Sequence, residues 1–192
     1  MRPGGRYASV RMKDGREATL RALRKEDLPS LVKFVNGLVA EKRHHADLGV
    51  VIDQKATRAS ESEYLEKVLT GIRKGDVISV AAEVDGEVAG NSEITRRSSS
   101  RETWHVGVLG IAVLHPYRSA GLGEAMMQTL LKEAKRAGIE LIELEVFALN
   151  DKARRLYERH GFKEVGVVPG KIRRGRRRLD IVVMYANLRT AN

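Results

Sequence analysis

The order of strand-like and helical runs is the feature that most limits the fold of this 192-residue chain. Two strand-like runs, 77–84 and 87–95, are joined by Asp85-Gly86, a dipeptide typical of two-residue hairpin turns. A strand, a helix, a second strand and a second helix then follow between residues 104 and 160. The chain closes with two more strand-like runs, 163–171 and 179–188. This order predicts an α/β fold with a mixed sheet.

The amino-terminal part is expected to supply a short strand and two helices. Apolar residues recur at helical spacing from Leu28 to Val39, and Ser60 with Glu63 forms a capping box ahead of a second helical run. Residues 1–14 are weakly patterned, and no composition break divides the rest. We therefore expect a flexible N-terminal arm over 1–14 and one domain over 15–192.

Composition excludes several classes of protein. Without cysteine the chain has no disulfide, no thiolate metal site and no cysteine nucleophile. No apolar run approaches the ~18 residues of a membrane span, and the first residues lack the apolar core of a signal peptide, which predicts a cytoplasmic protein. The five histidines show no ligand spacing, and His44 and His45 are adjacent, so no metal site is expected.

The charge is concentrated in one stretch. The net charge is +10, and six basic residues lie within 171–178, KIRRGRRR, so this stretch carries more than half of the excess. Such a run is usually a solvated turn, but it can also bind an anionic partner. Because aromatic residues make up only 5% of the chain and no stacking motif is present, direct nucleic-acid binding is less favoured. The favoured partner is a protein or peptide acceptor with acidic neighbours, or a target bound to nucleic acid.

The segment 111–123, IAVLHPYRSAGLG, has the pattern of a phosphate-binding turn. Arg118, Gly121 and Gly123 form R-x-x-G-x-G between a strand and a helix. Glycine lets the backbone approach an anion closely, the helix N-terminus attracts it, and arginine adds a fixed positive charge. The Walker lysine motif is absent, and position 126 is Met rather than the third glycine of a dinucleotide fingerprint. Glycines also serve such turns for folding alone, so the pattern by itself leaves both interpretations open.

The next segment, 144–162, reads LEVFALNDKARRLYERHGF. The R-x-x-G-x-G turn followed by N-x-x-A-x-x-L-Y-x-x-x-G-F resembles the GNAT family of N-acetyltransferases. The resemblance is strongest over 104–185 and looser over 18–95, where the order of elements matches but little of the sequence does. It implies a single GNAT-like domain with a mixed, mostly antiparallel sheet flanked by helices. It also implies transfer of acetyl from acetyl-CoA to an amine.

The resemblance assigns two groups of residues to acetyl-CoA. Backbone groups at the strand end would meet the pantetheine arm, and these belong to Ile111, Ala112 and Val113. The following turn would wrap the pyrophosphate with Arg118, Ser119, Ala120, Gly121, Leu122, Gly123 and Glu124. Asn150 stands where the family keeps a CoA-contacting asparagine, although Asn is also a leading N-cap residue.

Acyl transfer to an amine needs a base and an acid. The amine must lose a proton before it attacks the thioester, and the leaving thiolate gains from a nearby acid. Glu145 matches the base of the family's ribosomal-protein N-terminal acetyltransferases and ranks first, with Glu93 as the rival. Tyr157 stands where the family keeps the tyrosine that protonates the thiolate and contacts the cofactor. The residues alone leave open a core role for Tyr157 and a solvated position for Glu145.

These observations predict an acetyl-CoA-dependent N-acetyltransferase. Direct transfer in a ternary complex is expected, because the chain has no cysteine to carry the acyl group. A protein lysine or N-terminal amine is the favoured acceptor, and a small amine such as an amino acid is the alternative. The competing class is a non-catalytic acyl-CoA-binding or nucleic-acid-associated module. Homodimers are common in the family, and the residues leave the oligomeric state open.

Overall fold

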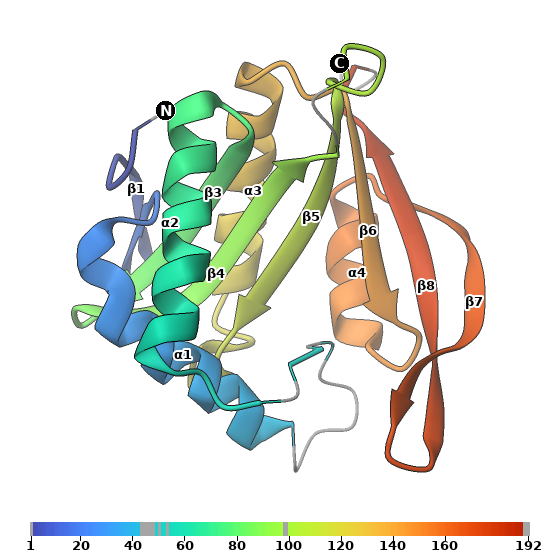
Figure 1. The fold of residues 1–192 in the computed structure, drawn as a ribbon, viewed down its shortest axis with the longest axis horizontal. Helices are drawn as coiled ribbons and strands as arrows, with labels where there is room; N and C mark the ends of the chain where they lie inside the picture. The colour runs from blue at the N-terminus through green and yellow to red at the C-terminus, as the bar shows by residue number, and fades with distance from the viewer. Residues whose placement is uncertain (1, 43–48, 50, 53, 98–99, 190–192) are drawn as a thin grey trace.

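The computed structural model describes residues 2–42, 49, 51–52, 54–97 and 100–189. Within them, one sheet has the strand order β1-β2-β3-β4-β5-β6-β8-β7 (Figure 1). Its strands are β1 (Arg6–Arg11), β2 (Glu17–Arg21), β3 (Val77–Val84), β4 (Glu87–Arg96), β5 (Val106–Val113), β6 (Leu141–Phe147), β7 (Lys163–Arg174) and β8 (Arg177–Asn187). The helices are α1 (Leu28–Glu41), α2 (Arg58–Lys74), α3 (Leu122–Arg136) and α4 (Asp151–Arg159), with short 3-10 turns η1 (Lys25–Asp27) and η2 (His115–Tyr117).

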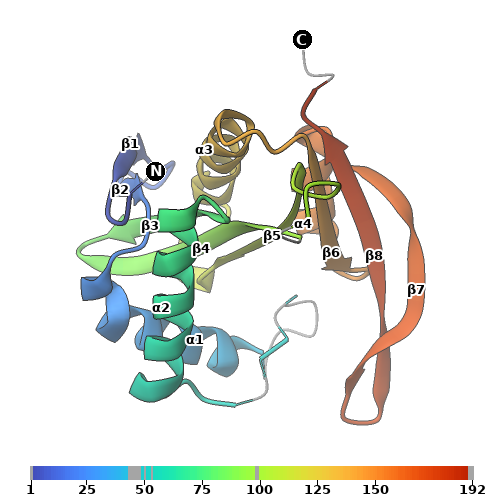
Figure 2. The same cartoon turned by 45° about the horizontal axis from the view of Figure 1, so that its top comes forward.

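Helices cover both faces of the sheet. Helices α1 and α2 lie on one face and α3 and α4 on the other (Figures 1 and 2). Each face has its own buried cluster: Leu31, Phe34 and Leu69 belong to the first, and Met126 and Leu130 to the second. Among the described residues, no helix is long and apolar enough to span a bilayer. The mixed, mostly antiparallel sheet flanked by helices confirms the predicted fold class.

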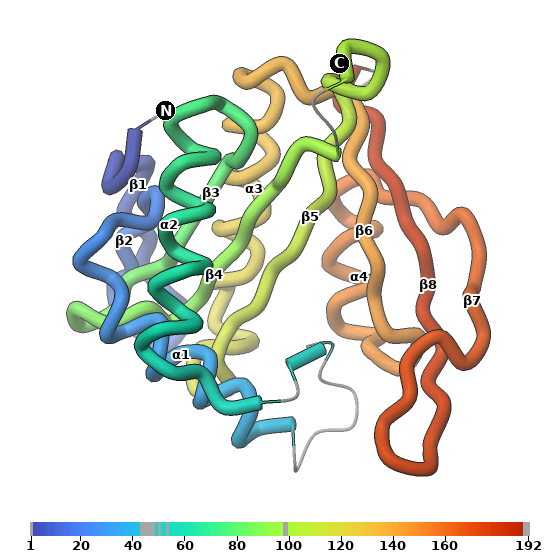
Figure 3. The backbone as a smooth tube through the Cα atoms, in the orientation of Figure 1, coloured from blue at the N-terminus to red at the C-terminus, as the bar shows by residue number. Residues whose placement is uncertain are grey.

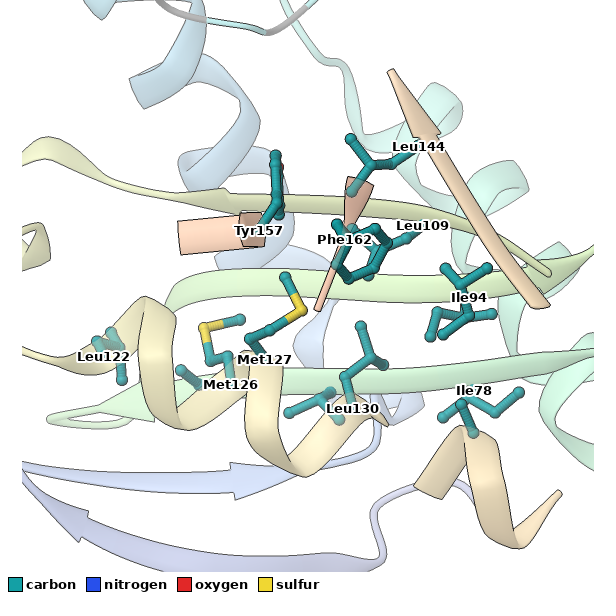
Figure 4. Close-up of a cluster of buried hydrophobic side chains, with 14 of the residues drawn as sticks. Ile78, Ile94, Leu109, Leu122, Met126, Met127, Leu130, Leu144, Tyr157 and Phe162 are labelled. Atoms are coloured by element: carbon teal, nitrogen blue, oxygen red, sulfur yellow. The ribbon is translucent and has the colours of Figure 1, made fainter. Parts of the chain in front are cut away.

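Helix α3 forms because its apolar residues recur every four positions. Leu122, Met126, Leu130 and Ala134 are all fully buried against the sheet. Figure 4 shows the α3 side chains meeting Tyr157 of α4 and Phe162. Burying each large apolar side chain contributes about 1.5–3 kcal/mol. This packing fixes the N-terminus of α3 against the end of β5.

Strands β5 and β6 separate along their length. They are the parallel pair of the sheet, and their register runs only from Val106 opposite Leu141 to Val108 opposite Glu143. Beyond Val108, β5 stays paired with β4 as far as Val113, and β6 stays paired with β8 as far as Phe147. The two strands therefore diverge toward the lower end of the sheet in Figure 3.

The first strand corrects the expectation of a flexible arm over residues 1–14. Strand β1 pairs with β2 from Arg11 opposite Glu17 to Arg6 opposite Arg21. The sheet therefore begins before residue 15. The missed signal is Asp14-Gly15, a hairpin dipeptide between two strands that weak patterning concealed.

The closing hairpin is longer than its sequence suggests. The expected strands were 163–171 and 179–188, but the ladder continues through Arg173 opposite Arg178 and Arg174 opposite Arg177. Gly175, at φ 61°, supplies the left-handed conformation of the tight turn. The register shifts between Val168 and Ile172, which is typical of a bulge that bends a strand.

A buried ion cluster joins β2 to β3. Arg21 is 3% exposed, and its guanidinium donates to both carboxylate oxygens of Asp27 at 2.6 and 2.7 Å. It also donates to Glu83 at 2.6 and 2.9 Å. Every charge in this cluster has a partner, as buried charges require.

Candidate active site

A pocket of about 1010 Å³ opens where β5 and β6 separate. Residues from both strands, from the turn before α3 and from α4 line it. Those that the sequence predicted are Ile111, Ala112, Val113, Arg118, Ser119, Gly121, Gly123, Glu124, Glu145, Asn150 and Tyr157. Ala120 and Leu122 do not line it, because their side chains are buried in the core.

Alternate residues of β5 direct their backbone groups into this pocket. The His105 carbonyl accepts from the amides of Glu140 and Leu141 on the β6 side, whereas the Leu114 amide donates to the β4 side. Backbone groups of successive residues in a strand point to opposite edges. The pair Val108–Glu143 still uses the Leu109 N–H, so the Leu109 C=O and both the N–H and C=O of Ile111 face the gap.

The turn before α3 concentrates backbone donors. Ser119 and Gly121 have φ of 61° and 88°, so the chain turns through left-handed conformations there. Gly121 is the N-cap of α3 and supplies no side-chain cap, which leaves first-turn N–H groups for an anion. The predicted phosphate turn thus has the backbone geometry of an anion site.

Two cations lie beside that turn. Arg118 is held in place, because its guanidinium donates to the Val113 carbonyl at 2.7 Å and pairs with Glu41 of α1. Lys13 also lines the pocket, and its amide donates to the Ala120 carbonyl at 3.0 Å. Sequence reasoning missed Lys13 because it lies in the turn between β1 and β2, within the segment expected to be loose.

Glu124 is an acid at a site that favours anions. Its carboxylate pairs with Arg159 at 3.0 Å and lies 2.7 Å from His160. The hydrogen bond from Arg159 is the main reason why the pKa of Glu124 lies below its ordinary value. These partners offset its negative charge, so its backbone amide is the part suited to a phosphate.

Helix α4 supplies Asn150 and Tyr157. Asn150 caps the helix by accepting from the Ala153 amide at 3.1 Å, and it also lines the pocket. Tyr157 is 6% exposed and packs against Phe162, with ring centroids 5.8 Å apart. Burial raises the pKa of Tyr157 to about 12, so its hydroxyl stays protonated at neutral pH.

Glu93 lies in a polar cluster between β4 and α2. The hydroxyl of Tyr64 donates to Glu93, and Asn91 Nδ2 donates to Tyr64 Oη at 2.9 Å. Burial is the main cause that raises the pKa of Glu93, although the hydrogen bonds from Tyr64 and Asn91 lower it. Asn91 Oδ1 is buried and has no hydrogen-bond partner among the described residues.

Gly110 connects this cluster with the pocket. Glu93 does not line the pocket itself, but it is opposite Gly110, which does. A Cβ at Gly110 would meet no atom within 4 Å, so the space beside Glu93 is open. The Cβ positions of directly opposed residues in an antiparallel pair lie about 4.5–5.5 Å apart, so Glu93 lies one such step from the pocket lining.

Glu145 differs from Glu93 in both exposure and partner. It lines the pocket from β6, is exposed, and forms an ion pair with Lys171 of β7. Leu144 and Val146 belong to the core on the α3/α4 face, so Glu145 points to the α1/α2 face. The two candidate bases thus flank the gap on one face, whereas Tyr157 approaches it from the other.

The described residues contain no group of three His, Cys, Asp or Glu arranged to hold a metal. His44 and His45 lie outside the described residues.

Comparison with known proteins gives consistent matches. Residues 47–162 match the model of the acetyltransferase (GNAT) family. The chain is 38% identical over 97 residues to "N-alpha-acetyltransferase" of Sulfurisphaera tokodaii; the match covers 45% of this chain and 57% of that protein. It is 24% identical over 170 residues to "Putative phosphinothricin acetyltransferase YwnH" of Bacillus subtilis; this match covers 88% of this chain and 99% of that protein.

A solved structure has the same fold. The structure of yncA from Salmonella typhimurium with its cofactor acetyl-CoA superposes with a TM-score of 0.76 at 20% identity, covering 89% of this chain and 94% of that one. The family model spans more than half of the chain, including the separated strands, the turn before α3 and helix α4. We conclude that this chain belongs to the GNAT family of acetyltransferases.

Proposed function

We propose that this chain transfers acetyl from acetyl-CoA to a primary amine, by direct transfer in a ternary complex. One observation carries the proposal: the pocket between β5 and β6 is lined by the turn before α3, by Tyr157 and by Glu145, and Glu93 lies opposite its lining residue Gly110. When bound there, acetyl-CoA would supply the thioester. The pocket's backbone donors and cations suit its phosphates.

The turn residues and β5 would hold the donor. First-turn N–H groups of α3, with Arg118 and Lys13, would bind the pyrophosphate. The Leu109 C=O and the N–H and C=O of Ile111 would pair with the amides of the pantetheine arm, as β6 pairs with the start of β5. The Ile111 N–H is also suited to stabilise negative charge on the thioester oxygen.

We assign the base to Glu93 rather than to Glu145. A base works best when its pKa approaches the working pH, and burial moves the pKa of Glu93 in that direction. Glu145 is exposed, and its carboxylate is already engaged by Lys171. Glu93 would take the proton through water beside Gly110, and the unpartnered Oδ1 of Asn91 would accept an N–H of the amine.

We assign the acid to Tyr157. Its hydroxyl is un-ionised at neutral pH, and the residue lines the pocket from the face opposite to Glu93. The amine would lose its proton on the α1/α2 face while the thiolate gains one on the α3/α4 face. Base and acid therefore stand apart, as separate proton transfers require.

The favoured acceptor is a peptide or protein amine. Among these, an N-terminal amine is favoured over a lysine side chain. An α-amino group has a reference pKa of about 7.8 against about 10.4 for lysine, so less work is needed to deprotonate it. The likeness to the "N-alpha-acetyltransferase" of Sulfurisphaera tokodaii supports this choice. The likeness to YwnH, named for phosphinothricin, favours a small amine as the second candidate.

Thermal unfolding with acetyl-CoA tests the donor site. A ligand that binds only the folded state stabilises it by about 2.7 kcal/mol at a hundredfold excess over Kd. We expect Arg118→Gln to weaken binding about tenfold or more, because it removes a charge-assisted contact. Arg136→Gln, at the far end of α3, is the control.

Acetyl transfer to peptides and free amino acids then tests the reaction. Turnover of a peptide N-terminus is the expected result. Tight acetyl-CoA binding without turnover of any amine would support a non-catalytic acyl-CoA-binding protein. No stabilisation by acetyl-CoA would reject the donor site itself.

A further inference from the structure

A second pocket of about 480 Å³ lies between the end of α1 and the β7–β8 hairpin. Its described lining residues include four cations and no acid or aromatic side chain: Lys42, Val51, Lys171, Ile172, Arg173, Arg174 and Gly175. We refer to it as the basic groove. We propose that it binds acidic side chains following the acceptor amine of a peptide substrate. This inference rests on the proposed acetyl transfer.

Several cations of the groove are held in place by neighbouring groups. Arg174 lies over the ring of Phe147, 5.2 Å from its centroid. Lys42 donates to the Ile52 carbonyl at 2.8 Å, and Lys171 pairs with Glu145. Cations that are already positioned lose less side-chain entropy on binding an anion. The groove is thus better organised than a solvated charge run.

The groove adjoins the pocket between β5 and β6, which we call the donor pocket. Glu145 lines the donor pocket and its ion-pair partner Lys171 lines the groove, so this pair separates the two spaces. Gly49 lines the first and Val51 the second. Figures 1 and 2 show the β7–β8 hairpin extending past the end of β6. A substrate in the groove would therefore place its amine near the gap.

The groove lies on the face where the base stands. Glu145 points to the α1/α2 face, as does Glu93, which bonds to Tyr64 of α2. Helix α3, whose N-terminus carries the proposed pyrophosphate turn, packs on the other face. Arg118 of that turn is held by Glu41 and by the Val113 carbonyl, so the turn has a cation of its own. We therefore expect the acceptor in the groove and the donor phosphates at the turn.

The spacing of the cations suits an extended peptide. Lys171 and Arg173 are two residues apart in β7, which corresponds to about 6.6 Å. Alternate side chains of an extended peptide repeat at the same distance. The groove offers no aromatic surface on which bases could stack, which disfavours single-stranded nucleic acid.

The test compares peptides that share an N-terminal residue and differ next to it. One carries two acidic residues after the first, one carries two uncharged residues, and one carries two lysines. We expect the acidic peptide to have the highest kcat/KM, mainly through a lower KM. Its advantage should shrink as salt is raised from about 50 to 300 mM, because exposed charges are screened.

Arg173→Glu and Arg101→Glu make the same charge change at two exposed arginines. Arg173 lines the groove, whereas Arg101 lies in the loop between β4 and β5 and lines neither pocket. Arg173→Glu should lower kcat/KM for the acidic peptide about tenfold, leaving the uncharged peptide and the stabilisation by acetyl-CoA unchanged. Arg101→Glu should have little effect.

Four outcomes would overturn the inference. The first is an equal loss of kcat/KM in the two variants, and the second is no preference of the wild type for the acidic peptide. The third is that free aspartate is acetylated as efficiently as the acidic peptide. The fourth is that a single-stranded RNA 12-mer competes while acidic peptides show no preference. Failure of the proposed function looks different, because no amine is then acetylated. In that case Arg173→Glu must still weaken binding of the acidic peptide, measured by fluorescence anisotropy, or the inference is rejected too.

Discussion

At Glu93 the burial that would suit the proposed base also costs stability. Its folded-state pKa lies above the unfolded value of about 4.3, so the folded state favours the protonated form. Whatever stability this proton confers is complete below the unfolded pKa and is lost as pH rises through the folded pKa. Above the folded pKa the charged carboxylate is therefore destabilising.

Glu93→Gln should separate activity from stability. We expect kcat/KM to fall about a hundredfold or more and the acidic limb of its pH profile to disappear, because the base is removed. The variant should also unfold at higher temperature than the wild type at pH 7 and lose that advantage at acidic pH. Glu145→Gln is the comparison. A larger loss of activity in that variant would identify Glu145, rather than Glu93, as the base.

Tyr157→Phe keeps the ring against Phe162 and removes only the hydroxyl. We expect kcat to fall about tenfold or more, with the Kd of acetyl-CoA nearly unchanged, because a proton donor matters only when the thiolate leaves. Tyr185→Phe, on β8 and outside the pocket lining, is the control. An unchanged kcat would return Tyr157 to a packing role.

At the scale of elements, the β1–β2 hairpin brings a cation to the donor pocket. Lys13→Gln should weaken acetyl-CoA binding about threefold to tenfold by isothermal calorimetry, because one positive charge beside the phosphate turn is lost. Arg11→Gln, two residues earlier and outside the pocket lining, should leave Kd unchanged. Equal effects would indicate a general charge effect instead.

The ion cluster between β2 and β3 should matter for stability alone. Arg21→Met would leave Asp27 buried without its main partner, at a cost of about 3–5 kcal/mol in urea unfolding. Lys33→Met breaks an exposed pair with Glu87 and should cost about 1 kcal/mol or less. Similar costs for both variants would contradict this account.

Local rules predicted the elements that later form the site. The glycine turn before α3, the cap at Asn150 and the apolar repeat from Leu122 follow from short-range chemistry, so the sequence alone indicates them. Contacts between residues far apart in the sequence do not follow from such local rules. That Lys171 meets Glu145 depends on a bulge in β7, and that Tyr64 meets Glu93 depends on how α2 packs on the sheet.

For the whole molecule, the gap between β5 and β6 has a mechanical consequence. The sheet's hydrogen-bond ladder is interrupted between β1–β5 and β6–β8 except at its narrow end. A donor bound along Leu109 and Ile111 would replace the missing rungs. Hydrogen exchange at the Ile111 amide should slow when acetyl-CoA binds, while amides in β3 stay unchanged. The bound substrate would then link the two parts of the sheet and reduce their motion relative to each other.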